Sequence, residues 1–108
     1  MDNNILQRIG ELGIVPVVKL DRAEDAVPLG RALLEGDLPI AEVTFRTDAA
    51  EESIKALSKE LPELLVGAGT VLTKEQVRRA VDAGAKFIVT PGFNPSVLDY
   101  CVENHIPI

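Results

Sequence analysis

The chain has 108 residues, enough for one domain with a buried core and too few for two domains of ordinary size. Its 46% hydrophobic and 26% charged residues are typical of a soluble globular protein. The net charge of −6, the scattered basic residues and the absence of Trp argue against a nucleic-acid or anionic-membrane surface.

The single cysteine and single histidine, Cys101 and His105, rule out an internal disulfide and nearly exclude a zinc site. We interpret Cys101 as a small buried residue of a helix. No stretch approaches the roughly 18 apolar residues of a membrane-spanning helix. The N-terminus also lacks the apolar run of a signal peptide. We therefore expect a cytoplasmic protein that holds no metal.

The first third of the chain predicts a helix, a strand and a second helix. Residues 3–12 place Ile and Leu at helical spacing, and a glycine follows them. The apolar run 14–18 is short enough for a buried parallel strand, although Pro16 cannot donate a hydrogen bond to a neighbouring strand. Asp21 is the predicted N-cap of the next helix, which Gly36 ends.

Residues 39–47 predict the strand that matters most for function, because Val, Thr and Phe fill its centre. Side chains alternate along a strand, so Glu42, Thr44 and Arg46 are expected on one face. A strand buried between helices should be apolar on both faces. An edge strand with one wetted face is the alternative interpretation.

The rest of the chain continues the alternation of strands and helices. The predicted strands cover 64–70, 87–90 and, as the start of a fifth, 105–108. Three more helices are predicted. Thr47 or Asp48 is the expected N-cap of the first, and Thr73 forms a capping box with Gln76 at the start of the second. Asn94 is the expected N-cap of the third, with Pro95 in its first turn.

Such an alternation predicts an α/β fold with a parallel sheet in a single domain, residues 1–108. A flavodoxin-like sheet and a (β/α)8 TIM barrel both use this unit. The short, even repeat favours the barrel, and so do the polar residues at the carboxyl ends of strands, where barrel active sites lie. These residues are Lys19, Glu42, Arg46, Thr70 and Thr90. A barrel needs about eight units, and this chain supplies four and the start of a fifth strand.

Four segments together resemble the first half of bacterial 2-keto-3-deoxy-6-phosphogluconate (KDPG) aldolases, which also act on 4-hydroxy-2-oxoglutarate. The resemblance covers essentially the whole chain, with the segments in the order and spacing of the family. They are Gly-Ile-Val-Pro-Val-Val at 13–18, Glu-Val-Thr-Phe-Arg-Thr at 42–47, Gly-Ala-Gly-Thr-Val at 67–71 and Thr-Pro-Gly at 90–92.

The resemblance implies a class I aldolase, usually a homotrimer, that needs no cofactor and acts on keto sugar acids to release pyruvate. A lysine on the sixth strand of such enzymes forms a Schiff base with pyruvate, and it has no counterpart in these 108 residues. By resemblance, Glu42 shuttles protons through a water molecule. Arg46 and Thr70 hold the pyruvate carboxylate, and the backbone around Pro91 lines the pocket. Family members generally carry a glycine where this chain has Asp37.

The chemistry of the residues agrees with these roles. Cleaving an aldol bond needs a base, and burial of Glu42 would raise its proton affinity while a nearby Arg46 would oppose that change. A guanidinium suits a carboxylate ligand. The structural alternatives are an ion pair between Glu42 and Arg46, and a helix cap at Thr70. Lys19 is the only lysine at the rim, where we expect it to be solvated.

Three functions therefore remain open. The first is an aldolase whose Schiff-base lysine lies outside this sequence, so that the 108 residues alone are inactive. The second is a half-barrel that assembles with copies of itself, as a dimer or a trimer, without enzymatic activity. The third is a module that binds small carboxylates.

Overall fold

The computed structural model describes residues 3–108. In chain order its elements are α1 (Asn3–Leu12), β1 (Val17–Val18), the short 3-10 helix η1 (Ala23–Asp25), α2 (Ala26–Glu35), β2 (Ile40–Thr44), α3 (Ala50–Glu60), β3 (Leu65–Gly69), α4 (Lys74–Ala83) and α5 (Pro95–Glu103).

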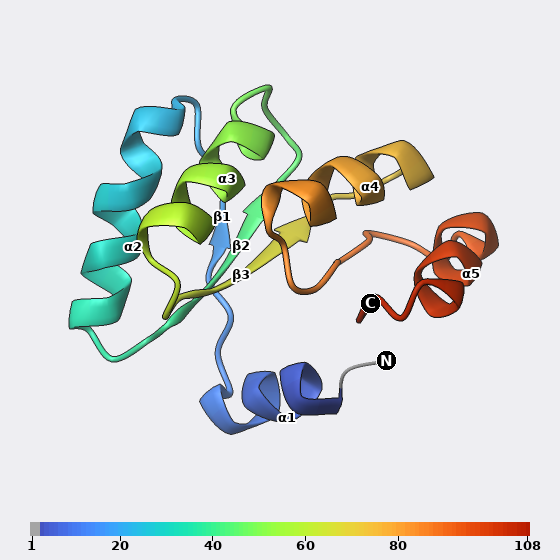
Figure 1. The fold of residues 1–108 in the computed structure, drawn as a ribbon, viewed down its shortest axis with the longest axis horizontal. Helices are drawn as coiled ribbons and strands as arrows, with labels where there is room; N and C mark the ends of the chain where they lie inside the picture. Colours follow the sequence, from blue (N-terminus) through green and yellow to red (C-terminus); the bar gives the residue numbers. More distant parts are fainter. Residues whose placement is uncertain (1–2) are drawn as a thin grey trace.

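The three strands form one parallel sheet in the order β1-β2-β3. Helices α2, α3 and α4 lie along one side of this sheet (Figure 1). The main hydrophobic core fills the space between them and includes Val43 of β2, Val66 of β3 and Ile54 of α3. We call the opposite side of the sheet the inner face, because it corresponds to the interior of a barrel.

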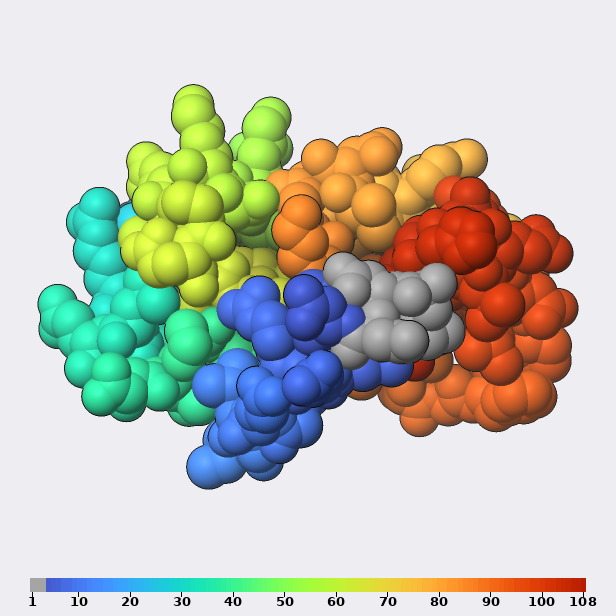
Figure 2. Space-filling view, turned by 60° about the horizontal axis from the view of Figure 1, so that its bottom comes forward, coloured from blue at the N-terminus to red at the C-terminus, as the bar shows by residue number. Residues whose placement is uncertain are grey.

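Helix α1 lies at the amino ends of the strands, apart from the other helices (Figure 1). Its Ile5 packs in a second core with Ile40, Leu65 and Phe87. In the space-filling view α1 lies at the front, between the teal α2 and the red C-terminal segment (Figure 2). The apolar stripe of residues 3–12 therefore covers the amino end of the inner face.

Several local signals in the sequence formed as predicted. The hydroxyl oxygen of Thr73 accepts a hydrogen bond from the backbone N–H of Gln76 at 3.1 Å, which caps α4. The side chain of Asn94 accepts from the N–H groups of Ser96 and Val97 at the start of α5. Helix α4 ends at Gly84, whose φ of +119° lies in the left-handed region.

Two predicted caps were wrong. Asp21 does not cap a helix, because η1 comes first and α2 begins at Ala26, with Asp25 at its N-cap. Neither Thr47 nor Asp48 is the N-cap of α3, which is Ala49. The Thr47 hydroxyl accepts from the N–H of Ala49 at 3.3 Å and donates to the backbone carbonyl of Leu20, on the preceding βα connection. A short polar side chain can thus join a local contact to a tertiary one.

Strands β1 and β2 are shorter than predicted. Pro16 lies outside β1 yet contributes its carbonyl oxygen, which accepts from the N–H of Glu42 at 2.9 Å. Strand β2 ends at Thr44, so that Phe45 and Arg46 lie in a turn. The N–H of Phe45 makes the last bond to β3, by donating to the carbonyl of Gly69 at 2.8 Å. After it the chain leaves the sheet for α3.

The predicted strands at 87–90 and 105–108 do not form named strands, although the N–H groups of Lys86 and Val89 donate to the carbonyls of Val66 and Ala68 in β3, each at 2.8 Å. Ile88 forms a single parallel bridge with Ala68 of β3. The N–H of Ile88 donates to the carbonyl of Pro107 at 2.9 Å. Pro107 has no backbone N–H to donate. The C-terminal segment therefore lies next to residues 87–89 without the repeated hydrogen bonds of a regular strand. No helix within residues 3–108 combines the length and apolar character needed to cross a membrane.

Candidate active site

The central polar residue of the inner face is Glu42, in the middle of β2. It pairs with Val17 of β1 on one side and Gly67 of β3 on the other. Its side chain is only 7% exposed. The carboxylate leans toward the carboxyl end of the sheet and lies against Gly69: a Cβ atom on Gly69 would be 2.7 Å from its Cδ. Glu42 is therefore held over β3.

A cavity of about 170 Å³ opens beside Glu42. All its other lining residues are apolar and come from α1, the segment before β1, and the two C-terminal segments: Leu6, Ile9, Val15, Phe87, Ile88, Val89, Pro107 and Ile108. Burial in these surroundings raises the pKa of the Glu42 carboxyl group above its ordinary value. A raised pKa makes the carboxylate a stronger base, which suits a role in proton transfer.

Arg46 does not share the inner face with Glu42, contrary to the sequence prediction. Its turn places the exposed side chain against a separate polar cavity of about 150 Å³. Within residues 3–108 no ion pair joins Arg46 to Glu42. The alternative interpretation of the two residues as a structural ion pair was therefore wrong. The expected opposing effect of Arg46 on the Glu42 pKa is not found either.

The polar cavity beside Arg46 contains an interhelical ion pair that the sequence did not reveal. The guanidinium of Arg79 in α4 donates from Nε and Nη2 to the two carboxylate oxygens of Glu51 in α3, each at 3.2 Å. Glu51 raises the pKa of Arg79 through this hydrogen bond and its charge. Gln76 also lines this cavity. Glu51 and Arg79 are 28 positions apart, so no local pattern could have paired them.

Thr70 follows β3 directly and lies half-buried at the carboxyl edge of the sheet. Its φ of +55° is in the left-handed region, which is rare for a β-branched residue. Because the cap of α4 is Thr73, the alternative interpretation of Thr70 as a helix cap was wrong. A left-handed backbone conformation strains a residue of this type, and such strained residues are common at functional sites, where the surrounding structure imposes the conformation.

The segment around Pro91 lies at the same edge as Thr70. The N–H of Val71 donates to the carbonyl of Val89 at 3.3 Å, which brings the two segments together. Pro91 itself is exposed, and the hydroxyl of Thr90 donates to the carbonyl of Gly92 at 3.3 Å. Thr90 therefore stabilises its own turn, in keeping with a structural role.

Two further candidates have structural surroundings. The amino group of Lys19 lies 3.3 Å from a carboxylate oxygen of Asp21, and both side chains are largely exposed. Cys101 is fully buried in α5, and burial raises the pKa of its thiol. The interpretation of Cys101 as a buried core residue is thus confirmed.

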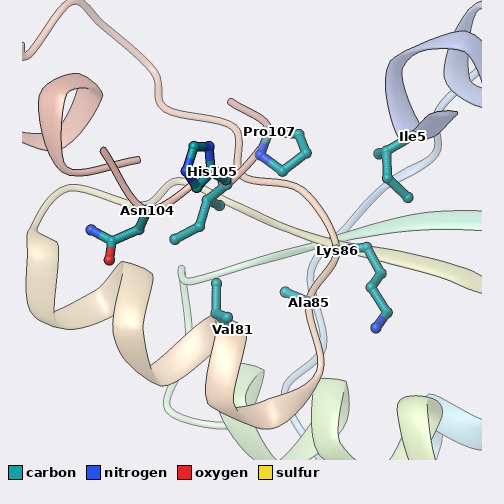
Figure 3. Close-up of a pocket in the computed structure, with 8 residues that line it drawn as sticks. Ile5, Val81, Ala85, Lys86, Asn104, His105 and Pro107 are labelled. Atoms are coloured by element: carbon teal, nitrogen blue, oxygen red, sulfur yellow. The ribbon is translucent and has the colours of Figure 1, made fainter. Parts of the chain in front are cut away.

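A larger cavity, of about 310 Å³, lies at the amino side of the sheet (Figure 3). Val81 of α4, His105 and Lys86 are among its lining residues. Figure 3 shows the amino group of Lys86 pointing away from His105 and Asn104, so these polar groups do not converge on one point. Within residues 3–108, no three His, Cys, Asp or Glu side chains are grouped to hold a metal ion.

The sequence matches the model of the KDPG and KHG aldolases over residues 5–108. This chain belongs to the KDPG and KHG aldolase family. The 2-dehydro-3-deoxy-phosphogluconate aldolase of Treponema pallidum is 50% identical over 104 residues, which cover 96% of this chain and 50% of that protein. The corresponding enzyme of Haemophilus influenzae is 46% identical over 104 residues, which cover 96% of this chain and 49% of that protein.

Solved structures agree with this family assignment. The KDPG aldolase of Legionella pneumophila, with pyruvate captured as a covalent carbinolamine intermediate, superposes with a TM-score of 0.82 and 39% identity, over 86% of this chain and 45% of that one. The chain spans about half the length of the curated relatives that it matches. The predicted α/β fold with parallel strands, of the type found in TIM-barrel aldolases, is confirmed.

One feature of this aldolase-family site was missed from the sequence. Gly67 and Gly69 leave β3 without side chains on the inner face, and Phe87 and Glu42 occupy the space. The alternation of glycines in a predicted strand was a visible signal, because glycine within a strand often marks a close approach by another group.

Proposed function

We propose that this chain supplies the proton-transfer and carboxylate-binding part of a class I aldolase acting on a 2-keto-3-deoxy sugar acid phosphate or on 4-hydroxy-2-oxoglutarate. The observation that carries the proposal is the burial of the Glu42 carboxyl group in a cavity whose other lining residues are apolar. This burial raises the pKa of the carboxyl group. Family membership supports it. A carboxylate whose basicity is increased by burial is suited to act as a general base.

Arg46 and Thr70 are the proposed ligands of the substrate carboxylate, with the backbone at Pro91 beside them. All three follow strand segments at the carboxyl edge of the sheet, where barrel enzymes bind their substrates. Arg46 lies in a turn and is exposed. Its side chain must therefore turn from the polar cavity toward the inner face to meet a carboxylate near Glu42.

The proposed chemistry also needs an amine that forms a Schiff base, because the iminium accepts the electron pair released when the carbon–carbon bond breaks. The chain has five lysines: Lys19, Lys55, Lys59, Lys74 and Lys86. Only Lys19 is near the carboxyl edge, and it pairs with Asp21. We therefore expect no efficient aldolase activity from these 108 residues alone. Incubation with pyruvate and borohydride followed by mass spectrometry tests this, and stoichiometric labelling would contradict it.

The roles of Glu42 and Arg46 are tested in a protein that contains these residues together with the Schiff-base lysine. Glu42→Gln should lower kcat by about 10²–10⁴-fold, the usual contribution of general acid–base catalysis, while borohydride trapping of pyruvate persists. Arg46→Ala should mainly weaken pyruvate binding. Near-normal turnover by Glu42→Gln would exclude its role as the proton shuttle.

A second proposal is that the chain associates with copies of itself. Val17 of β1 is 63% exposed and Ile14 just before it is 65% exposed, at the free edge of the sheet. Unpaired sheet edges favour association. A cage designed by fusing symmetric oligomeric domains resembles this chain at a TM-score of 0.77 and 26% identity. Sedimentation equilibrium should show a dimer or a trimer, and a compact monomer at micromolar concentration would contradict the proposal.

A further inference from the structure

Gly69 occupies the point of β3 against which the carboxylate of Glu42 rests. A Cβ atom on Gly69 would lie 2.7 Å from Cδ and 2.9 Å from Cγ of Glu42, closer than such atoms can approach. We propose that Gly69 is a positioning residue for Glu42, because the missing side chain leaves the space in which the carboxylate is held on the inner face. The inference rests on the proposed function only for the role of Glu42 in proton transfer.

Steric space, rather than backbone conformation, is the reason for this glycine. Gly13 and Gly84 are the glycines with positive φ among residues 3–108, and Gly69 is not one of them. Its backbone is that of a regular strand, which residues with side chains adopt readily. Glycine weakens a strand interior, so a glycine at this point needs another explanation, and the carboxylate that fills its place supplies one.

The strand register explains why the contact involves Gly69. Glu42 lies directly opposite Gly67, whereas Gly69 lies opposite Thr44, two residues further along the sheet. The Glu42 side chain therefore leans along the strand direction, as side chains on strands commonly do. This tilt carries the carboxyl group toward the edge where Thr70 follows, and so toward the proposed substrate site.

The same contact fixes the position of the carboxyl group. With a methyl group on residue 69, the carboxylate would have to rotate out of its present position, because the flexible end of the side chain moves more easily than the backbone. The cavity beside it is lined by apolar side chains. Among the described residues that line this cavity, Glu42 alone has a titratable side chain.

The test is a titration of the Glu42 carboxyl carbon by nuclear magnetic resonance in the 108-residue chain, with the signal assigned by its loss in Glu42→Gln. Gly69→Ala should shift the titration midpoint, because the carboxylate must leave the position against residue 69 and enter different surroundings. The matched control is Gly30→Ala in α2, whose Cβ would lie 2.7 Å from Leu57 and Leu61, away from the inner face. Gly30→Ala should leave the Glu42 midpoint unchanged. An unchanged midpoint in folded Gly69→Ala would overturn the proposal.

A double-mutant cycle covers the case in which Gly69→Ala does not fold. In a Glu42→Ala background the overlapping group is gone, so Gly69→Ala should be tolerated and the double variant should fold. If Gly69→Ala were equally damaging in both backgrounds, the glycine would serve another purpose and the proposal would fail. Neither measurement uses substrate, so normal turnover by Glu42→Gln would remove the proposed function without changing these results.

Discussion

The ring of Phe87 packs against Gly67 and occupies the place of a side chain there. A Cβ atom on this glycine would lie 2.5 Å from Cε1 of the ring. Phe87 is only 4% exposed and packs with Ile5 of α1 in the core at the amino end of the sheet. The contact thus links β3 to the helix that covers the inner face. A residue larger than glycine at position 67 would displace the ring or separate β3 from it.

Gly67→Ala should accordingly destabilise the chain by about 1–3 kcal/mol, the usual cost of overpacking a core. The free energy of unfolding from denaturant titrations measures it. Gly10→Ala in α1 is the control, because a Cβ atom there meets nothing within 4 Å. It should stabilise the chain by about 0.5–1 kcal/mol through helix propensity. Equal stabilities for Gly67→Ala and the wild type would contradict the packing seen here.

Asp37 lies in the turn before β2, and its φ is +60°. The left-handed conformation costs a residue with a side chain about 1–2 kcal/mol, which the greater flexibility of unfolded glycine partly offsets. Asp37→Gly should therefore raise the free energy of unfolding by up to about 1 kcal/mol.

Asp37→Ala is the matched variant, because alanine keeps the Cβ atom and lacks the local hydrogen bonding that helps aspartate adopt this conformation. It should lower stability while Asp37→Gly raises it. Destabilisation by both substitutions would show that the carboxylate, rather than the backbone, determines the turn before β2.

Ser53 is fully buried in α3, and its hydroxyl oxygen has no hydrogen-bond partner among the described residues. An unsatisfied buried polar group costs about 1–3 kcal/mol. Ser53→Ala should therefore stabilise the chain by about 1 kcal/mol in thermal or denaturant unfolding.

Thr44→Val is a contrasting variant, because the Thr44 hydroxyl donates to the carbonyl of Val18 at 2.8 Å. Its loss should destabilise the chain by about 1 kcal/mol. Opposite signs for the two substitutions are the expected result. Destabilisation by Ser53→Ala comparable to that by Thr44→Val would mean that the Ser53 hydroxyl has a partner in solution.

The sequence was sufficient for the order of α1 to α5 and of β1 to β3, which local signals such as the caps Thr73 and Asn94 help to mark. It was less reliable at strand ends. Phe45 and Thr47 have high strand propensity, yet β2 ends at Thr44, and the Thr47 hydroxyl bonds to Leu20 on the neighbouring connection. Such contacts between distant residues override propensity and are invisible in a single sequence.

The candidate site was predicted in part for the same reason. The burial of Glu42 followed from its position in an apolar strand, and the structure agrees. The separation of Arg46 from Glu42 could not be predicted, because it depends on where β2 ends. The ion pair of Arg79 with Glu51 depends on the packing of α4 against α3, which no spacing within either helix reveals.

The raised pKa of Glu42 makes a prediction about stability as a function of pH. Burial raises the pKa of this carboxyl group above the ordinary value of 4.5, so the folded chain binds the proton more tightly than the unfolded chain does. The stabilisation from this difference is fully present below the ordinary pKa. It is lost as the pH rises through the pKa of the folded state, because a buried carboxylate must then be charged.

Glu42→Gln removes this loss, since the amide does not ionise. The free energy of unfolding of Glu42→Gln relative to the wild type should therefore increase as the pH is raised from 4.5 toward neutral. Denaturant titrations at a series of pH values measure this difference, and Glu63→Gln, at an exposed position, controls for the loss of one negative charge. A difference that stays constant with pH, or decreases, would show that the Glu42 carboxylate is better solvated or better paired than its apolar surroundings indicate.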